Sequence, residues 1–240
     1  MATSADRRVD GRQSRWDRHN AERRQHLIDA AVAEIEASPP GSEIHVHQIA
    51  ARAGVGRTVV YRHFDDRADL DRAVTAEIVD GLAERLVAEV TLDGTIPDIV
   101  RRVVGSYVEW ASGHPPLHML VIQGSGAGGS PLEEGMGRIA GQVHELLGYA
   151  IEVLGLDASD DELAALDSLA YGLVGAVFGA VRRWSGSDPE SRPAPDVLVG
   201  LVADSVWFLI SGHAAHLGLV LDRDQPVEEV LLGALSEPTP

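Results

Sequence analysis

The chain has 240 residues, which is enough for one large domain or for a small domain joined to a larger one. It contains no cysteine, so disulfides, thiolate metal sites and cysteine nucleophiles are excluded. The N-terminal part is polar and arginine-bearing and lacks the apolar run of a signal peptide, and no later segment is expected to span a membrane. The sequence therefore predicts a soluble cytoplasmic protein.

The formal net charge of −17 would oppose binding to nucleic acid if it were spread evenly. It is concentrated in the C-terminal part, because residues 1–72 contain 12 arginines and 12 acidic residues, whereas residues 73–240 contain 8 arginines and 25 acidic residues. A neutral, arginine-bearing head joined to an acidic body is typical of a protein that contacts DNA at one end and repels it elsewhere.

Apolar residues recur at helical spacing along almost the whole chain, which predicts an all-α fold with about nine helices. The first helix is expected over about 20–37, where a Pro-Pro-Gly sequence ends it. Two short helices are expected near 46–53 and 57–63. A long fourth helix is expected from Asp65 to about Val90, and its length makes it a natural connector.

The later helices are expected over about 97–112, around 117–123, and over 131–154, 161–184 and 196–219. The last two are apolar around most of their circumference, so they need cover on more than one face. A second copy of the chain is the expected cover. Small residues would let the four helices of such a pair pack closely, namely Gly172, Gly175, Gly179 and Ala203.

Residues 46–64 carry the strongest signal in the sequence. Ala50 is small where two helices would cross closely, and Gly54 can take the left-handed conformation that a tight inter-helix turn requires. Gly56 opens the second helix, whose first turn exposes Arg57 and Thr58 to a major groove. Residues 46–64 are therefore predicted to form a helix-turn-helix. Its miniature core is expected to consist of Ile49, Ala53, Val55 and Val60.

This stretch resembles the tetracycline-repressor (TetR) family of bacterial regulators. The family signature appears here as Ile49-Ala50, Ala53-Gly54-Val55 and Tyr61-Arg62-His63-Phe64, followed by Arg67 and Leu70. The match covers about residues 20–75. The chain departs from the pattern at Gly56 and His45, where the family commonly has a serine or threonine helix cap.

The resemblance implies four segments: an arginine-bearing flexible arm at 1–19, a three-helix DNA-binding domain at 20–65, an effector-binding and dimerisation domain at 66–222, and a tail at 223–240. The implied partners are a double-stranded DNA operator, a small-molecule effector and a second copy of the chain, held through 161–184 and 196–219. The expected function is that of a dimeric repressor released by its effector, with no cofactor and no enzymatic activity.

The resemblance also assigns DNA contacts. It places Arg57 and Thr58 at base edges and Tyr61, His63 and Arg67 at the DNA backbone, with arginines of the arm reaching a phosphate or the minor groove. Tyr61 could instead serve only the core. The complete set of expected DNA-contacting residues is Arg57, Thr58, Val59, Tyr61, Arg62, His63, Arg67 and His47.

In the family, the helices after the connector enclose an effector cavity. A mostly apolar lining with a few polar groups favours a lipophilic ligand with a small polar handle, although each such side chain could equally be core. The expected effector-binding residues are Tyr107, Trp110, His114, Met119, Ile122, Gln123, Met136, His144, Leu147, Tyr171 and Phe178.

Other signals are weaker. Residues 124–129 contain a G-x-G-x-x-G pattern, but no strands accompany it, so an inter-helix loop is favoured over a dinucleotide site. The pairs His114/His118 and His213/His216 have a spacing suited to a metal but lack an obvious third ligand, so no metal site is predicted.

Two alternatives stay open. The main one is a helical small-molecule-binding protein or enzyme whose helix-turn-helix is incidental, although no nucleophile-elbow motif is present. The other is an activator or a ligand-independent regulator.

Overall fold

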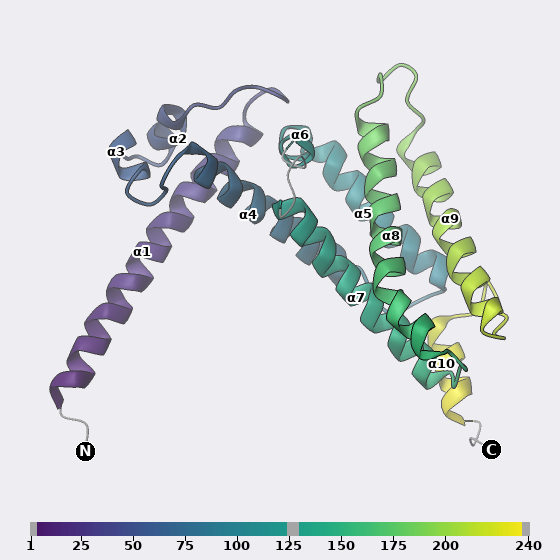
Figure 1. Ribbon diagram of the computed structural model, residues 1–240. Helices are drawn as coiled ribbons and strands as arrows, with labels where there is room; N and C mark the ends of the chain where they lie inside the picture. Colours follow the sequence, from purple (N-terminus) through teal and green to yellow (C-terminus); the bar gives the residue numbers. More distant parts are fainter. Residues whose placement is uncertain (1–3, 124–129, 237–240) are drawn as a thin grey trace. The chain divides into compact units, whose positions relative to one another are not determined.

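The computed structural model describes residues 4–123 and 130–236. Within these ranges the secondary structure is α-helical, apart from an isolated antiparallel bridge between Thr95 and Pro226. The helices, labelled in Figure 1, are α1 (Ser4–Glu36), α2 (Val46–Arg52), α3 (Arg57–Val60), α4 (Arg67–Ala88), α5 (Ile96–Gly113), α6 (Pro115–Gln123), α7 (Pro131–Val153), α8 (Asp160–Ser185), α9 (Pro195–His216) and α10 (Val227–Ser236). The all-α prediction is confirmed, with ten helices in the described part of the chain where about nine were expected.

Both ends of the chain are more helical than expected. Residues 4–19, expected as a flexible arm, belong to α1, because no proline precedes Pro39 and the segment is rich in arginine, a good helix former. The expected tail contains α10, whose apolar residues recur at helical spacing. The start of α10 is held by the amide of Val227, which donates to the carbonyl of Gly94 at 2.9 Å.

The chain divides into two compact units. The first comprises the residues up to Ile78 together with α6, and the second comprises residues 79–114 and the helices from α7 onward. The boundary therefore falls inside α4 and not between residues 65 and 66. Leu70 and Val74 of α4 are buried in the first unit, and Leu82 and Leu86 are buried in the second. A continuous helix thus supplies core residues to both units.

The core of the first unit forms where α1 packs on α2 and α6. Its most deeply buried side chains include Leu27, Ile49, Val60, Phe64, Leu70 and Val121. Because Val60 and Phe64 belong to the second half of the helix-turn-helix, this core also fixes the orientation of α3.

In the second unit, α7 packs along α8 and α5 packs along α9 (Figure 1). The start of α5 is fixed by a capping box, in which the amide of Asp98 donates to Thr95 Oγ1 and the amide of Thr95 donates to the Asp98 carboxylate. The hydrogen bonds from Thr95 lower the pKa of Asp98 because they favour its charged form. Ser159 and Glu162 form the same arrangement at the start of α8.

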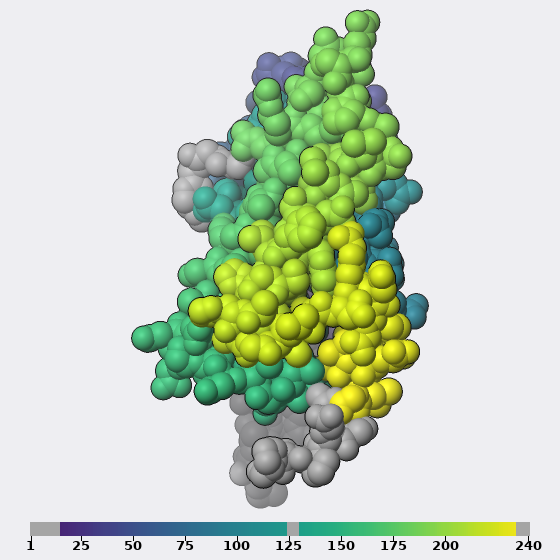
Figure 2. All heavy atoms as spheres, turned by 90° about the vertical axis from the view of Figure 1, so that its right-hand side faces the viewer, coloured from purple at the N-terminus to yellow at the C-terminus, as the bar shows by residue number. Residues whose placement is uncertain are grey.

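By length and composition, α8 and α9 are each apolar enough to cross a membrane, which corrects the expectation that no segment is. Only 17% of the apolar window of α8 and 22% of that of α9 is buried within the chain, and Figure 2 shows both helices on the surface. Asp204 lies in the middle of α9 and pairs with Arg223. Because a carboxylate at the centre of a bilayer is costly, this feature favours a protein partner over a membrane as the cover.

Two glycines of α7 provide a matched test of the packing in the second unit. A methyl group at Gly135 would overlap Cγ1 of Val79, whereas one at Gly137 would meet nothing within 4 Å. We predict that Gly135→Ala lowers the free energy of unfolding by about 1–3 kcal/mol through overpacking. Gly137→Ala should raise it by about 0.5–1 kcal/mol, because alanine loses less backbone entropy in a helix. Urea titrations followed by circular dichroism measure both, and equal effects of the two variants would refute the close contact.

Candidate nucleic-acid interface and ligand cavity

The turn between α2 and α3 is built from backbone hydrogen bonds. The amide of Val55 donates to the carbonyl of Ala50 at 2.9 Å, and the amide of Gly54 donates to that of Ala51 at 3.1 Å. These two bonds form a Schellman motif, which requires a left-handed residue after the helix. Gly54 supplies it, with φ of +68°. The turn expected from the sequence is therefore present, for the expected physical reason.

Helix α3 is short, and a turn that ends at Phe64 continues it. The amide of His63 donates to the carbonyl of Val60 at 3.0 Å, as does that of Phe64 at 3.1 Å. Gly56 caps the start of α3 without a side-chain hydrogen bond, which agrees with the missing serine or threonine. Val60 and Phe64 are buried, and the guanidinium of Arg24 lies 4.6 Å from the centre of the Phe64 ring. The segment is thereby anchored on one side only.

The opposite side of this segment faces solvent. Among the residues expected to contact DNA, the exposed ones are His47, Arg57, Thr58, Tyr61 and Arg62. Val59, His63 and Arg67 are half-buried. The guanidinium of Arg57 lies 5.5 Å from the centre of the Tyr61 ring, so a cation–π contact holds these two side chains together. We refer to Arg57, Thr58, Tyr61 and Arg62 as the recognition surface.

The arginines of the first unit differ in whether they form ion pairs with carboxylates. Arg52 pairs with Glu34 at 2.5 Å, and Arg24 lies 3.9 Å from Asp69. Within residues 4–123 and 130–236, no carboxylate forms an ion pair with Arg57 or Arg62. Arg18 and Arg23 of α1 likewise have no carboxylate partner there, so Arg57 and Arg62 are distinguished by their place on the helix-turn-helix and not by unpaired charge alone.

Two of the residues expected to contact the DNA backbone interact with other groups in the chain. Arg67 has hydrogen-bond partners, and the pKa of His63 is shifted. Arg67 donates from Nε to Asp71 at 2.8 Å and from Nη1 to the carbonyl of Ile44, so its guanidinium already ties α4 to the loop before α2. Burial lowers the pKa of His63, and the charges of Arg23 and Arg24 lower it further. Both effects favour the neutral form of His63 in the chain itself.

The second unit contains a cavity of about 400 Å³, within the size range of small-molecule sites. Its walls come from the second half of α4 and from α5, α7, α8, α9 and α10. Four of the expected effector-binding residues line it, namely Tyr107, Met136, Leu147 and Phe178. The Tyr107 and Phe178 rings stack at 5.6 Å. Burial raises the pKa of Tyr107, so its hydroxyl stays protonated.

The other expected effector-binding residues lie elsewhere. Trp110 and His114 contact each other with ring centres 5.8 Å apart, His144 is half-buried, and Tyr171 is exposed, and none of these lines the cavity. The three residues of α6 belong to the first unit, because α6 packs on α1. Met119 and Gln123 line a smaller cavity there of about 110 Å³, and Ile122 is half-buried.

Most of the cavity lining was not anticipated. It is dominated by aliphatic residues, including Ile99, Val143, Ile151, Leu217 and Val230. In the sequence these look like ordinary core residues, so a search for aromatic and polar side chains passes over them. The spacing of apolar residues in α10 is the signal that would have placed that helix on the cavity.

The weaker signals of the sequence have these outcomes. The glycine-rich pattern at 124–129 lies outside the described residues. His118 is buried, and burial lowers its pKa to about 4. His216 lies 3.5 Å from Glu162, and His213 is an exposed residue of the cavity lining. Among the described residues, no group of three or more His, Asp or Glu side chains is arranged to hold a metal.

Comparison with known proteins gives both full-length and partial relatives. No family model matches the chain. The uncharacterized HTH-type transcriptional regulator Rv0472c of Mycobacterium tuberculosis is 30% identical over 222 residues, which cover 91% of each chain. The HTH-type transcriptional repressor LfrR of Mycolicibacterium smegmatis is 31% identical over 86 residues, which cover 36% of this chain and 44% of LfrR.

Two solved structures share the fold over nearly the whole chain. A TetR-family transcriptional regulator from Streptomyces coelicolor superposes with a TM-score of 0.62 and 22% identity, covering 91% of this chain and 90% of that one. RolR in complex with the ligand resorcinol superposes with a TM-score of 0.58 and 17% identity, covering 93% of this chain and 98% of RolR.

The left-handed turn can be tested without disturbing any contact, because a methyl group at Gly54 would meet nothing within 4 Å. We predict that Gly54→Ala lowers the free energy of unfolding by about 1–2 kcal/mol, the cost of a left-handed backbone for a residue with Cβ. Gly54→Asn should recover part of this loss, because asparagine tolerates that conformation. Thermal denaturation compares the three proteins. If alanine and asparagine are tolerated equally, the strain does not lie in the backbone.

Proposed function

This chain belongs to the TetR family of helix-turn-helix transcriptional regulators, and from that membership we propose that it is a dimeric cytoplasmic repressor released from a palindromic operator by a small, largely apolar effector. That the chain is a DNA-binding regulator follows from its full-length relatives. The observation that carries the proposed mode of binding is the recognition surface, whose two arginines have no carboxylate partner in the described part of the chain.

The recognition surface suits the reading of a major groove. An arginine in the first turn of a recognition helix can donate two hydrogen bonds to the edge of a guanine, and Arg57 occupies that place. Thr58 beside it can contact a base edge or a thymine methyl group. Tyr61 and Arg62 lie further along the same segment, where contacts to phosphates fix the register without reading sequence.

Repression and release by an effector are supported by relatives and by the cavity. LfrR is named a transcriptional repressor, and RolR was crystallised with resorcinol. The cavity of this chain is large enough for a ligand of comparable or greater size. Helix α4 supplies buried residues to the first unit and lining residues, Leu82 and Leu86, to the cavity. We propose that an effector acts through this helix by favouring one of two arrangements of it.

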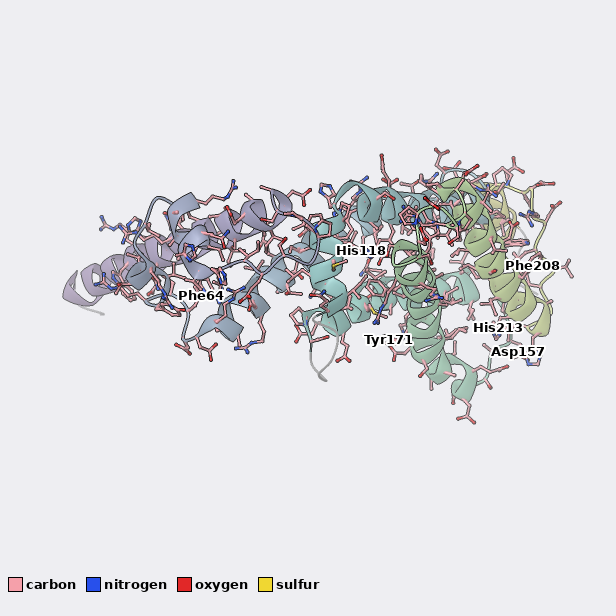
Figure 3. The ribbon with its side chains drawn as sticks, turned by 90° about the horizontal axis from the view of Figure 1, so that it is seen from above. Phe64, His118, Asp157, Tyr171, Phe208 and His213 are labelled. Carbon is pink, nitrogen blue, oxygen red and sulfur yellow. The ribbon has the colours of Figure 1, made fainter. Side chains whose placement is uncertain are left out.

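A homodimer through α8 and α9 is supported by the exposed apolar side chains of these helices. On α9, Val197, Leu201 and Phe208 recur at helical spacing with 58%, 67% and 64% of their surface exposed. On α8, Tyr171 is 40% exposed next to the exposed Gly172 (Figure 3 labels Tyr171 and Phe208). A two-fold contact would cover this face in both copies at once. Ala203, expected in the interface, is instead fully buried within the chain.

Removal of the arginine side chain tests the recognition surface. We predict that Arg57→Ala weakens binding to the cognate operator by about 1–3 kcal/mol and relaxes specificity at one base pair. Tyr61→Phe should weaken binding to all sequences alike, because a phosphate contact carries no base information. The operator is first selected from a pool of random duplexes, and fluorescence anisotropy then gives affinities at fixed salt.

The matched control is Arg138→Ala, which removes an exposed arginine from α7, outside the recognition surface and the proposed dimer helices. This variant should keep wild-type affinity and specificity. If Arg57→Ala binds the selected operator as tightly as Arg138→Ala does, the recognition surface is wrongly assigned.

A charge on the exposed face of α9 tests the dimer. We predict that Leu201→Asp yields a monomer, because burial of this side chain in both copies contributes about 3 kcal/mol or more, which corresponds to about 100-fold in the dissociation constant. Val220→Asp places the same carboxylate on a residue that is 89% exposed beyond α9, and should stay dimeric. Light scattering with size-exclusion chromatography in detergent-free buffer reports the mass. A monomeric wild-type protein at micromolar concentration would disprove the proposed dimer.

A further inference from the structure

The cavity of the second unit carries no formal charge on its walls. Among its lining residues, all of which lie in the described ranges, none is Asp, Glu, Lys or Arg. The side chains able to form hydrogen bonds are those of Thr91, Tyr107, Gln142, Tyr149 and His213. All other lining residues are aliphatic apart from Met136, Phe178 and Gly135.

The few polar groups lie mostly at the rim. Thr91, Gln142, Tyr149 and His213 are exposed, and His213 is labelled on α9 in Figure 3. Thr91 Oγ1 already accepts a hydrogen bond from Arg102 at 2.7 Å. Tyr107 is the buried member of the set. The interior therefore offers a surface of hydrocarbon with a single hydroxyl.

The cavity is lined along most of the length of α7. Its lining residues on this helix run from Leu132 to Ile151, and Leu154 follows just after the helix end. At a rise of 1.5 Å per residue, Leu132 and Ile151 lie about 28 Å apart. The cavity is therefore bordered by apolar side chains over the length of an extended hydrocarbon chain, whereas a compact ring system would contact only part of this wall.

The charges of the second unit disfavour an anionic ligand. Residues 79–114 and 127–240 contain 8 arginines and 24 acidic residues, and the cavity lining includes no arginine. A carboxylate or phosphate drawn into the interior would lose its hydration without gaining a cationic partner. A purely aqueous filling is also unfavourable, because a buried water needs two to four polar partners and the interior supplies few.

We propose that the effector of this protein is an uncharged lipid with one long aliphatic chain, such as a fatty alcohol or a fatty acyl ester. This inference rests on the proposed function, since it names the ligand class of the same cavity. The chain lies along α7, and the uncharged polar end meets either the Tyr107 hydroxyl or the exposed groups at the rim. The affinity comes from burial of the ligand's hydrocarbon chain in the cavity. It is lost when a charged group of the ligand must enter the cavity as well.

The experiment measures ligand binding in the absence of DNA, with the full-length protein at pH 8. Methyl cis-parinarate, a fluorescent C18 ester, is titrated against cis-parinaric acid, which has the same chain and a free carboxylate. We expect the ester to bind with one molecule per subunit and at least tenfold more tightly than the acid. Competition by octanol and dodecanol should show affinity that rises with chain length, by up to about fourfold per methylene.

A cavity-filling variant locates the binding site. Val143→Trp places a bulky ring midway along the α7 lining and should weaken ester binding at least tenfold, while operator binding shows that the protein is folded. Ala150→Phe serves the same purpose nearer the end of α7 if Val143→Trp does not fold. Val220→Trp is the matched control, because Val220 is 89% exposed and lies outside the lining.

Several results would overturn the inference. Equal affinity for ester and acid would refute the requirement for an uncharged ligand, and tighter binding of resorcinol than of dodecanol would refute the long chain. Unchanged ester binding in both cavity-filling variants would place the ligand elsewhere. If the protein binds its selected operator and neither parinaric probe, the ligand class is wrong and the proposed regulator stands. If it binds the ester and no selected DNA, the proposed function is wrong.

Discussion

The second unit has more apolar helix surface than one chain can bury, and most of its properties depend on this imbalance. Side chains such as Leu201 and Phe208 remain largely exposed on the surface of the unit, while other aliphatic side chains line the cavity instead of packing on one another. Each uncovered square ångström of apolar surface costs about 25 cal/mol. A second copy of the chain and a hydrocarbon ligand would each cover one of these surfaces. Both would stabilise the folded state by mass action, so stability and function are linked in this unit.

The first unit differs from the second in that its exposed surface is polar. Its core must hold the exposed side chains of the recognition surface in a defined orientation. Val60 and Phe64 fix the recognition segment from below, and the Schellman turn at Gly54 sets the angle at which it leaves α2. Arg52 pairs with Glu34 and Arg67 with Asp71, whereas Arg57 and Arg62 have no carboxylate partner in the described ranges. The recognition surface therefore presents positive charge to solvent although the unit is not basic overall.

The sequence predicted best those features that depend on neighbouring residues. The helix-turn-helix is of this kind, because Gly54 and the spacing of Ala50, Val55 and Val60 act within one short segment. Features that depend on distant residues were predicted poorly. Ala203 was expected at a dimer interface and is buried in the chain's own core, and α6 joins the first unit. A stripe of apolar residues indicates that one face of a helix is covered, but it does not indicate by which element. The cavity-lining residues Val143 and Leu217 therefore could not be distinguished in the sequence from ordinary core residues.

An uncharged cavity also limits how an effector can act on DNA binding. A ligand shifts an equilibrium between two arrangements only by the difference in its affinity for them. Where charged groups line a site, one relocated ion pair can supply that difference, but the interior of this cavity has no such group among its described residues. In the mechanism proposed above, the difference would come from apolar area that α4 covers in one arrangement and exposes in the other, and Leu82 and Leu86 are lining residues on that helix. Effector strength in this protein should therefore follow the hydrocarbon that a ligand buries against α4, and not its number of hydrogen-bonding groups.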